Sequence, residues 1–432
     1  MLTSVQRREK IWDVVRVASG NFLEMYDFFV YGYFAVYIAK TFFPADNEFV
    51  SLMLSLGTFA AGFLMRPLGG LILGSYIDRK GRRTGLIVTL GLMAVGTFTI
   101  ALTPSYNTIG LAAPLLVLGG RLIQGFSAGV ELGGVSVYLA EIATPGHRGF
   151  YCAWQSASQQ VAVIFASLLG VLLNTIIPAA QMAAWGWRIP VLIGCLIIPL
   201  ILILRRSLKE TEEFASRKRH PTAGEVLRII GDNWVLVLSG VLLSSLTTTT
   251  FYLITAYTPT FGKTVLHFRD IDSLTVTLCV GFSNLFWLPV GGAISDRIGR
   301  RPMLLAIPSA AILTAYPLMH WLVNNPSFGN LLVVQLWFSL IFGTYNGAMI
   351  PFLTEMMPPL VRTAGFSLAF SCATAIFGGM TPAVCTYLIH ATGNPAMPGA
   401  WLTVPAMLAL VSAFLTRPYR ELAAPSAAGA PA

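Results

Sequence analysis

Acidic and basic side chains occur inside long apolar segments of the first half of the chain. Glu24 and Asp27 stand one helical turn apart, so a helix would place both carboxylates on one face. Arg66, Arg121 and Glu131 follow in two further apolar segments. An ionisable group in the hydrocarbon of a bilayer costs about 2.5–3.5 kcal/mol on insertion scales, which makes it a candidate for a functional site.

These residue types predict carboxylate binding together with cation uptake. A guanidinium is a planar, bidentate partner for a carboxylate, so Arg66 and Arg121 are predicted to bind an acidic substrate. Burial favours the protonated form of a carboxyl group, so Glu24, Asp27 and Glu131 are predicted to take up a coupling cation. Two alternatives stay open: Arg121 could pair with a carboxylate to hold helices together, and Arg66 could serve a helix kink.

The second half of the chain offers neutral polar groups where the first half offers charge. A run of threonines could complete a binding site or satisfy backbone groups at a bend, and glutamines in the first half could line a path or join helices by hydrogen bonds. The polar residues in question are Gln124, Gln155, Gln159, Gln160, Thr247–Thr250, Tyr252, Tyr257, Asn284, Tyr345, Asn346 and Thr374.

The elements that position these residues are predicted to be membrane-spanning helices. The chain is 55% hydrophobic and 11% charged, whereas a soluble protein has about a quarter charged residues. Apolar runs of about 20 residues are long enough to cross a bilayer as helices. Twelve are predicted, at 15–40, 50–77, 84–103, 110–140, 149–174, 187–205, 234–261, 272–295, 302–322, 329–353, 363–390 and 398–416.

Lysine and arginine are concentrated in alternate loops, which predicts the orientation of the chain. Cytoplasmic loops of membrane proteins are enriched in these residues. The terminal segments belong to the basic set, so both termini are predicted to be cytoplasmic. The net charge of +9 therefore reflects topology, and no aromatic-rich basic surface indicates nucleic-acid binding.

Two short motifs each occur twice, and the two copies are separated by nearly the same number of residues in both cases. GSYIDRKGRR contains Asp78 and GAISDRIGRR contains Asp296, while EIATPGHR and EMMPPLVR share the spacing from Glu to Arg. The repeats predict two six-helix halves, at 1–205 and 234–420, with a cytoplasmic linker at 206–233. Residues 421–432 are of low complexity and are predicted to be a disordered tail.

Enzymatic and ATP-driven functions find no support in the sequence. The five cysteines lie within predicted helices without metal-ligand spacing, so neither a metal site nor structural disulfides are expected. No nucleophile–base set appears, and GRLIQG lacks the lysine of a phosphate-binding loop. The prediction is a protein that is not an enzyme.

The motifs resemble those of a known family. The two charged loops resemble the loop signature of the major facilitator superfamily, and RLIQGFSAG resembles the motif in its fourth helix. NFLEMYDFFVYG, FLMRPLGG, GVELGG and WGWRIP resemble its metabolite–proton symporter family. SASQQ, TTTTFYLITAYTPT and GTYNGAM are similar to the citrate and tricarballylate carriers within that family. The similarity covers residues 12–417.

The resemblance implies an all-α membrane protein with twelve transmembrane helices in two pseudo-symmetric six-helix bundles. It implies import of a tricarboxylate, citrate or tricarballylate, by symport with H⁺ or Na⁺ through alternating access. It further implies a functional monomer in the bacterial inner membrane, in contact with lipid and without a cofactor. Alternatives are 2-oxoglutarate, shikimate or a zwitterionic osmolyte as substrate, or a membrane sensor or channel.

Residues and resemblance together give three sets of candidate site residues. Substrate binding is predicted for Arg66, Arg121, Gln124, Gln155, Gln159, Thr248, Tyr252, Tyr257, Asn284, Tyr345 and Asn346. Cation coupling is predicted for Asn21, Glu24, Asp27 and Glu131. A cytoplasmic latch, for which a plain topological anchor is the alternative, is predicted for Gly74, Asp78, Arg82, Glu141, Arg148, Asp296, Arg300, Glu355 and Arg362.

Overall fold

Helices make up the regular structure of the computed structural model. It describes residues 21–80, 82–129, 143–206, 222–357 and 362–416, together with a few single positions between 130 and 142. Within these ranges no strand occurs. Apolar composition in long runs favours this outcome, because a helix satisfies its own backbone hydrogen bonds in a bilayer.

The helices of the first half begin with α2 and end with α12. In chain order they are α2 (Asn21–Tyr33), α3 (Ala35–Phe42), α4 (Glu48–Leu64), α5 (Arg66–Lys80), α6 (Arg82–Leu102), α7 (Tyr106–Ile109), α8 (Ala112–Ala128), α10 (Arg148–Ile176), α11 (Ala179–Gln181), the π-helix η1 (Met182–Gly186) and α12 (Arg188–Arg206).

The helices of the second half follow a short surface helix. They are α14 (Ala223–Asp232), α15 (Trp234–Tyr252), η2 (Leu253–Tyr257), α16 (Thr258–Thr264), α17 (Asp270–Ile298), α18 (Arg300–Asn324), α19 (Phe328–Met356), α20 (Arg362–Ala373), η4 (Thr374–Gly378), α21 (Thr381–Thr392) and α22 (Met397–Leu415).

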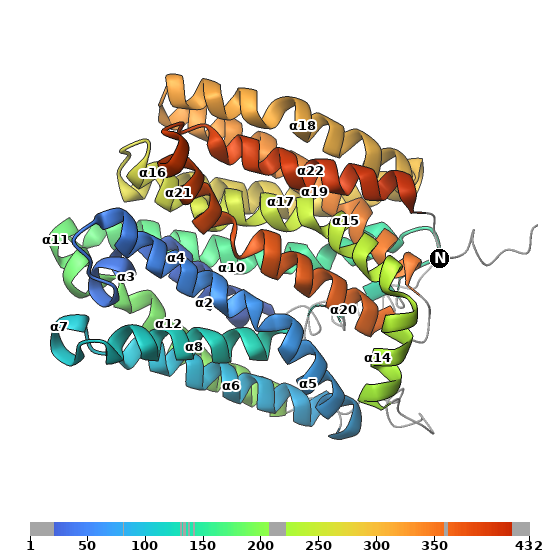
Figure 1. The fold of residues 1–432 in the computed structure, drawn as a ribbon, viewed down its shortest axis with the longest axis horizontal. Coiled ribbons are helices and arrows are strands. Elements are labelled where there is room, and N and C mark those ends of the chain that lie inside the picture. The colour runs from blue at the N-terminus through green and yellow to red at the C-terminus, as the bar shows by residue number, and fades with distance from the viewer. Residues whose placement is uncertain are drawn as a thin grey trace, which may run out of the picture.

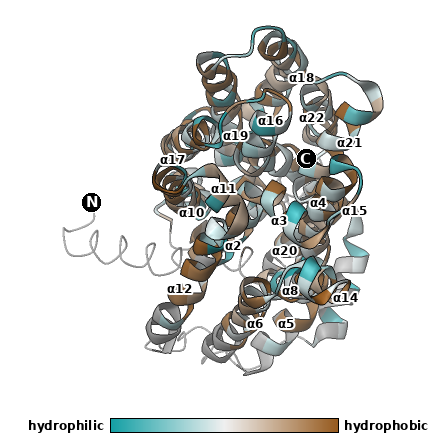
Figure 2. Cartoon of the chain, turned by 90° about the vertical axis from the view of Figure 1, so that its left-hand side faces the viewer, coloured by the Kyte–Doolittle hydropathy of each residue, from teal (hydrophilic) through white to brown (hydrophobic). Residues whose placement is uncertain are grey.

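The long helices run side by side from one end of the molecule to the other (Figure 1). The end that carries α14 is called the α14 end below, and the opposite end, with α3 and α16, the α3 end. A view along the bundle separates α6, α8 and α12 from α17, α18 and α22 (Figure 2). Helix α10 of the first half packs against α17 of the second half, and α5 contacts α20.

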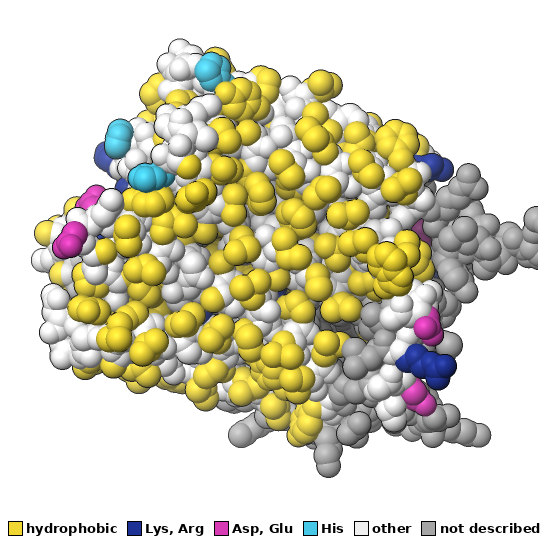
Figure 3. All heavy atoms as spheres, in the orientation of Figure 1, with side chains coloured by type: hydrophobic (Ala, Val, Ile, Leu, Met, Phe, Trp, Pro, Cys, Tyr) yellow, Lys and Arg dark blue, Asp and Glu magenta, His cyan; other side chains and the backbone are white. Residues whose placement is uncertain are grey.

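A broad apolar surface covers the middle of the bundle on the face drawn in Figure 3. On the face shown in Figure 3, hydrophobic side chains cover the centre, while the described charged and histidine side chains gather at the two ends. Among the described residues, eight helices are long and apolar enough to cross a membrane, and a bent pair, Ala179–Gly186 with Arg188–Pro199, allows a ninth. The prediction of an all-helical membrane protein is confirmed at this level.

Each of the twelve predicted segments contains helical residues in the structure. The four that fall outside the eight long spans are interrupted, short or bent: α2 and α3 are separate helices, and the apolar parts of α6 and α8 cover only 88–102 and 112–128. The count of twelve spans therefore stays a prediction.

Close contacts between small residues bring the helices of the first half together. A Cβ atom added to Gly125 of α8 would lie 1.6 Å from the carbonyl oxygen of Gly62 on α4, and one on Gly129 would lie 2.0 Å from the carbonyl oxygen of Arg66. Only glycine permits such close approach of backbones, which is how helices pack in a membrane. The contacts fix the position at which Arg66 enters the bundle.

Candidate functional site

Helix α2 carries two predicted coupling residues into the interior of the bundle. Glu24 and Asp27 are 5% and 7% exposed. The helix contacts α4, α10, α12 and η2, so it has neighbours from both halves of the chain. The structure therefore places both carboxylates inside the protein, away from the apolar outer surface.

Arg66 forms a buried ion pair with Glu24. It begins α5 directly after the break at Met65, is fully buried, and brings Nη2 to 3.0 Å from Oε1 of Glu24. Its guanidinium carbon lies 4.7 and 4.6 Å from the ring centroids of Phe28 and Phe63. A desolvated cation over an aromatic face is stabilised by about 2 kcal/mol, so the rings assist burial of this charge.

Arg66 also keeps donors that no described residue accepts. Its Nε and Nη1 atoms are buried and have no hydrogen-bond partner within the described residues. A buried donor without an acceptor costs about 1–3 kcal/mol, and more when it is charged. An additional anion at this position would therefore be stabilised by Arg66.

A second network joins Arg121 to Asp27. Nη1 of Arg121 donates to Oε1 of Gln124 at 2.8 Å, and Nε2 of Gln124 donates to Oγ1 of Thr97 at 3.0 Å and to Oδ2 of Asp27 at 3.4 Å. The hydroxyl of Thr97 donates to the same carboxylate oxygen. A Cβ atom added to Gly194 of α12 would lie 2.6 Å from Oδ1 of Asp27, so there is little room on the remaining side.

Aromatic rings enclose the Arg121 guanidinium. Its central carbon lies 4.2, 4.7 and 5.2 Å from the ring centroids of Phe28, Tyr31 and Phe59. The residue is fully buried, and its Nε and Nη2 atoms have no acceptor within the described part of the chain. Phe28 is therefore the ring that both buried arginines share.

A small cavity lies where the two halves meet. The centre of a water molecule can occupy a volume of about 20 Å³ inside it, so the cavity has room for one or two waters. Charged, polar and aromatic side chains all contribute to its wall. Its lining residues are Met25, Arg66, Leu132, Ser156, Gln159, Thr247, Thr248, Phe251, Tyr252, Phe342, Asn346, Phe370 and Thr374.

The cavity gathers only part of the predicted substrate-binding set. Arg66, Gln159, Thr248, Tyr252 and Asn346 line it. The remaining predicted residues do not: Arg121, Gln124, Gln155, Tyr257, Asn284 and Tyr345.

Two of these other residues bond to neighbouring helices, and a third bonds within its own helix. The Tyr345 hydroxyl donates to the carbonyl oxygen of Leu243 at 2.8 Å, and Tyr257 accepts from Thr386 at 3.2 Å. The Oε1 atom of Gln155 accepts from Ser156 at 2.8 Å. The alternative of hydrogen bonds between helices, considered for the glutamines, is realised at Gln124 and Gln160.

In the middle of the bundle, a hydrogen bond joins the two halves of the chain directly. Nδ2 of Asn284 on α17 donates to Oε1 of Gln160 on α10 at 3.0 Å, and Ser339 of α19 donates to Oδ1 of Asn284 at 2.6 Å. All three side chains are buried. This bond ties α10 to α17 near their midpoints.

At the cavity wall, Asn346 bonds to one of the threonines. Its Nδ2 atom donates to Oγ1 of Thr247 at 2.8 Å, whereas its Oδ1 atom has no donor among the described residues. Sequence reasoning did not single out Ser156, which faces the cavity beside Gln159. The spacing of three residues that places both on one helical face was the available signal.

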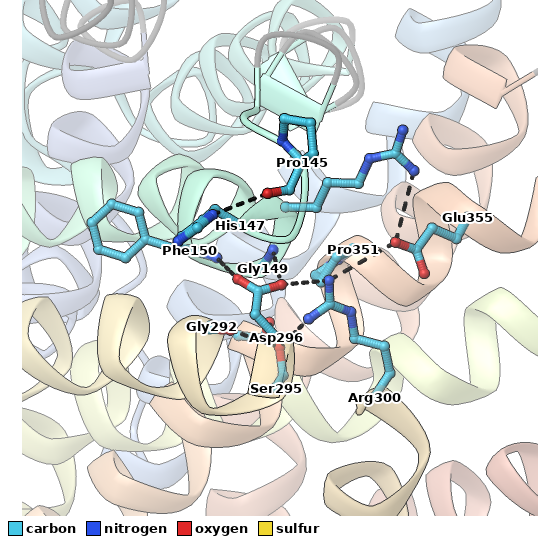
Figure 4. Close-up of polar contacts among 12 residues, drawn as sticks. Pro145, His147, Gly149, Phe150, Gly292, Ser295, Asp296, Arg300, Pro351 and Glu355 are labelled. Atoms are coloured by element: carbon cyan, nitrogen blue, oxygen red, sulfur yellow. Dashed lines mark hydrogen bonds and ion pairs between the residues drawn. The ribbon is translucent and has the colours of Figure 1, made fainter. Parts of the chain in front are cut away.

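At the α14 end, charged residues of both halves meet (Figure 4). The carboxylate of Asp296 accepts the amides of Gly149 and Phe150 at 2.8 and 3.0 Å, at the positive N-terminus of α10. Arg300 lies 2.7 Å from Asp296 and 3.9 Å from Glu355. Arg148 approaches Glu355 at 4.0 Å. This cluster, called the α10–α17 bridge below, joins the two halves.

The remaining predicted residues lie outside what the structure describes. Glu131 and Glu141 fall in undescribed positions. For five further positions the helical backbone is described but their surroundings are not: Asn21, Gly74, Asp78, Arg82 and Arg362.

Contacts between the halves also occur at the α3 end. The hydroxyl of Tyr37 on α3 donates to Asp270 at the start of α17, and Lys263 of α16 lies 2.8 Å from the same carboxylate. Lys263 also lies 4.0 Å from the Tyr37 ring centroid. Phe49 and His390 stack with ring centroids 3.7 Å apart. We call the Tyr37–Asp270–Lys263 group the α3-end bridge; sequence reasoning did not identify it.

Metal ligation and disulfides have no geometric support in the described residues. No group of three His, Cys, Asp or Glu side chains there is placed to hold a metal ion. The five cysteines are not bonded to one another.

One family model and several known proteins match the chain over most of its length. The family model of the Major Facilitator Superfamily matches residues 17–382. The chain is 60% identical to a citrate-proton symporter of Salmonella typhi over 92% of both chains, and 58% identical to one of Klebsiella pneumoniae over 93% of this chain and 91% of that one. Its fold is similar to the crystal structure of a D-xylose-proton symporter, with a TM-score of 0.73 at 18% identity over 93% of this chain and 96% of that one.

Proposed function

Since the chain belongs to the major facilitator superfamily, we propose that it imports citrate, a tricarboxylate, by proton symport. It is a transporter and not an enzyme. The citrate-proton symporters to which it is similar are matched over nearly their whole length, which supports both the substrate and the coupling ion. Tricarballylate and Na⁺ are the competing substrate and ion.

The observation that carries the proposal is that the buried Arg66 guanidinium has hydrogen-bond donors left for a ligand. This guanidinium lines the central cavity, is paired with Glu24 on one side, and has buried donors that no described residue accepts. A substrate carboxylate at the cavity would accept from those donors. Gln159, Thr248 and Asn346, which line the same cavity, would bond to the remaining oxygens of citrate.

The balance of charge supports proton coupling. Arg66 and Glu24 neutralise one another, and Arg121 is linked to Asp27 through Gln124, so the described centre offers no surplus positive charge to a polyanion. A substrate carboxylate and an ionised Glu24 would repel one another at close range in a medium of low dielectric constant. Protonation of Glu24 removes that repulsion and releases Arg66 to the substrate.

The bridges at both ends support transport by alternating access. The α10–α17 bridge and the α3-end bridge each connect a helix of the first half to one of the second. The cavity between them is too small for a tricarboxylate. We infer an occluded conformation, from which the halves rock apart at one end or the other about the central site.

The proposal includes the arrangement of the chain in the membrane. The apolar belt and the long helices make it a multi-pass membrane protein. We propose twelve spans in two six-helix halves, 1–205 and 234–420, joined at 206–233, as a functional monomer in the bacterial inner membrane. We propose that the α14 end and both termini face the cytoplasm, because the described residues Arg148, Arg297 and Arg300, from loops predicted to be cytoplasmic, lie at that end.

The test is uptake of labelled citrate and of labelled tricarballylate into proteoliposomes under an imposed H⁺ or Na⁺ gradient. We expect citrate to accumulate when a proton gradient is directed inward, and a Na⁺ gradient alone to drive none. Accumulation of tricarballylate in place of citrate would change the substrate, and Na⁺-driven uptake would change the ion. Absence of gradient-driven uptake of both acids would refute the proposal.

A further inference from the structure

Two charged networks lie close together, and no hydrogen bond identified between described residues joins them. The pair of Arg66 and Glu24 includes a residue that lines the cavity, whereas Arg121, Gln124 and Asp27 do not line it. Protonation of Glu24 acts at the substrate site itself, whereas a second proton on Asp27 would act from outside the cavity and needs a link to Arg66. The link between the two networks is therefore the feature to find.

The ring of Phe28 lies beneath both guanidinium groups. The central carbon of Arg66 is 4.7 Å from the ring centroid and that of Arg121 is 4.2 Å, which limits the separation of the two cations to about 9 Å. The ring is fully buried. Phe28 also follows Asp27 directly and stands one turn after Glu24, so one short stretch of α2 contacts both networks.

A shared ring makes the two cations sensitive to one another. Each is attracted to the negative face of the ring, and this attraction is largest where water is excluded. When Arg66 moves toward a substrate carboxylate, its contact with the ring and its repulsion of Arg121 both change. The hydrogen bond from Arg121 to Gln124 then passes the change to the Asp27 carboxylate.

The surroundings of Asp27 offer other groups that titrate or carry charge. Arg121 approaches from α8, the thiol of Cys195 from α12, and the hydroxyl of Tyr26 from α2 itself. Tyr26 donates to the carbonyl oxygen of Pro190 at 2.7 Å. Arg121 is the one cation among these groups, and it is the one that Phe28 contacts.

We propose that Phe28 is a positioning residue that couples carboxylate binding at Arg66 to the protonation of Asp27, through the guanidinium of Arg121. This inference rests on the proposed citrate–proton symport. It gives Phe28 a role that depends on the electrons of its ring, beyond the packing that any side chain of its size provides.

The test withdraws electron density from the Phe28 ring while keeping the size and shape of the side chain nearly unchanged. Phe28→3,4,5-trifluorophenylalanine preserves packing and weakens cation–π attraction, whereas Phe28→Tyr keeps an electron-rich ring. In proteoliposomes we compare proton-driven citrate accumulation, citrate counterflow without a gradient, and the pH dependence of the apparent KM. We expect the fluorinated variant to lose about tenfold more accumulation than counterflow, and to show a flatter pH profile. The Phe28→Tyr variant should keep proton coupling close to that of the wild-type protein.

Controls separate the possible failures. Phe282, on the outer face of α17, is 56% exposed, so Phe282→trifluorophenylalanine should leave both assays unchanged. If the fluorinated Phe28 protein accumulates citrate with the wild-type pH profile, or loses accumulation and counterflow equally, the inference is wrong. If the wild-type protein in the same vesicles shows no proton-driven citrate uptake, the proposed function itself fails.

Discussion

At the scale of single residues, the centre of the molecule depends on where each charge finds its partner. Glu24 and Asp27 were predicted to share a helical face, and both are buried. They nevertheless belong to different networks, one with Arg66 and the other with Thr97 and Gln124. Helical spacing predicts the face, but the partners come from the packing of other helices, which no local pattern contains.

Arg66→Lys should weaken citrate binding by at least about tenfold. A lysine keeps the charge but is a point donor, and it loses the planar geometry and the stacking on Phe28 and Phe63. The apparent KM of citrate uptake in proteoliposomes measures the effect. Arg269→Lys is the matched control, because that side chain is 79% exposed at the α3 end. An unchanged KM for Arg66→Lys would remove this residue from the site.

Glu24→Gln should abolish accumulation against a gradient while citrate exchange continues. The neutral amide resembles the protonated carboxyl group, so Arg66 is released permanently and protons no longer control it. Proton-driven uptake and counterflow are measured on the same vesicles. Glu48→Gln, at a side chain that is 87% exposed, should behave like the wild-type protein. Full proton-driven accumulation by Glu24→Gln would assign the coupling to another carboxylate.

At the scale of helices, close backbone contacts hold the arginines in place. Apolar runs predicted that helices would form in all twelve segments, because a single segment in hydrocarbon satisfies its backbone hydrogen bonds only as a helix. The helix kink considered for Arg66 is present as the break at Met65, two residues before Pro67, whereas the apolar runs did not predict the π-helical turns η2 and η4. The break at Met65 has a local signal, because Pro67 cannot donate a backbone hydrogen bond to the preceding turn. A pattern of hydrophobicity contains no corresponding signal for the π-helical turns.

Gly125→Ala should destabilise the protein and lower its activity. The added methyl group would meet the carbonyl oxygen of Gly62 at 1.6 Å, which forces α8 away from α4. We expect a loss of roughly 2 kcal/mol or more, from strain of the kind caused by overpacking. Gly119→Ala is the matched control on the same helix, because its Cβ atom would meet nothing within 4 Å.

Thermal unfolding in detergent, followed by tryptophan fluorescence, compares the two variants. Gly119→Ala should be neutral or slightly stabilising, because alanine favours a helix over glycine by roughly 0.5–1 kcal/mol. Equal melting temperatures for both variants would contradict the assigned contact between α4 and α8.

At the scale of the whole molecule, the two bridges lie at opposite ends of the bundle. The repeated loop motif predicted a latch containing Arg148, Asp296, Arg300 and Glu355, and the structure brings these four residues together. It did not predict the α3-end bridge, because Tyr37, Lys263 and Asp270 belong to no repeated motif. Whether either bridge opens during transport stays a prediction.

Asp296→Asn and Asp270→Asn should shift the resting conformation in opposite directions. The first weakens the α10–α17 bridge and should favour opening at the α14 end, whereas the second weakens the α3-end bridge and should favour opening at the other end. Spin labels on exposed positions 147 and 301 report on one end, and labels on exposed positions 45 and 392 report on the other.

Distances between these labels would be measured by double electron–electron resonance in lipid nanodiscs. The first variant should lengthen the 147–301 distance and leave 45–392 unchanged, and the second variant should do the reverse. Asp46→Asn, at an exposed residue, is the control for both. A lengthening at the same end in both variants would be incompatible with two opposed gates.

The buried charges of Arg66, Glu24, Arg121 and Asp27 sum to zero in their ionised forms. Moving one elementary charge across 100 mV of membrane potential involves about 2.3 kcal/mol, so a neutral centre reorients almost independently of voltage. For these four described residues, the return of the empty carrier is then electrically silent. The membrane potential acts on the step that carries substrate and protons, and the number of protons bound there determines the direction in which voltage drives the cycle.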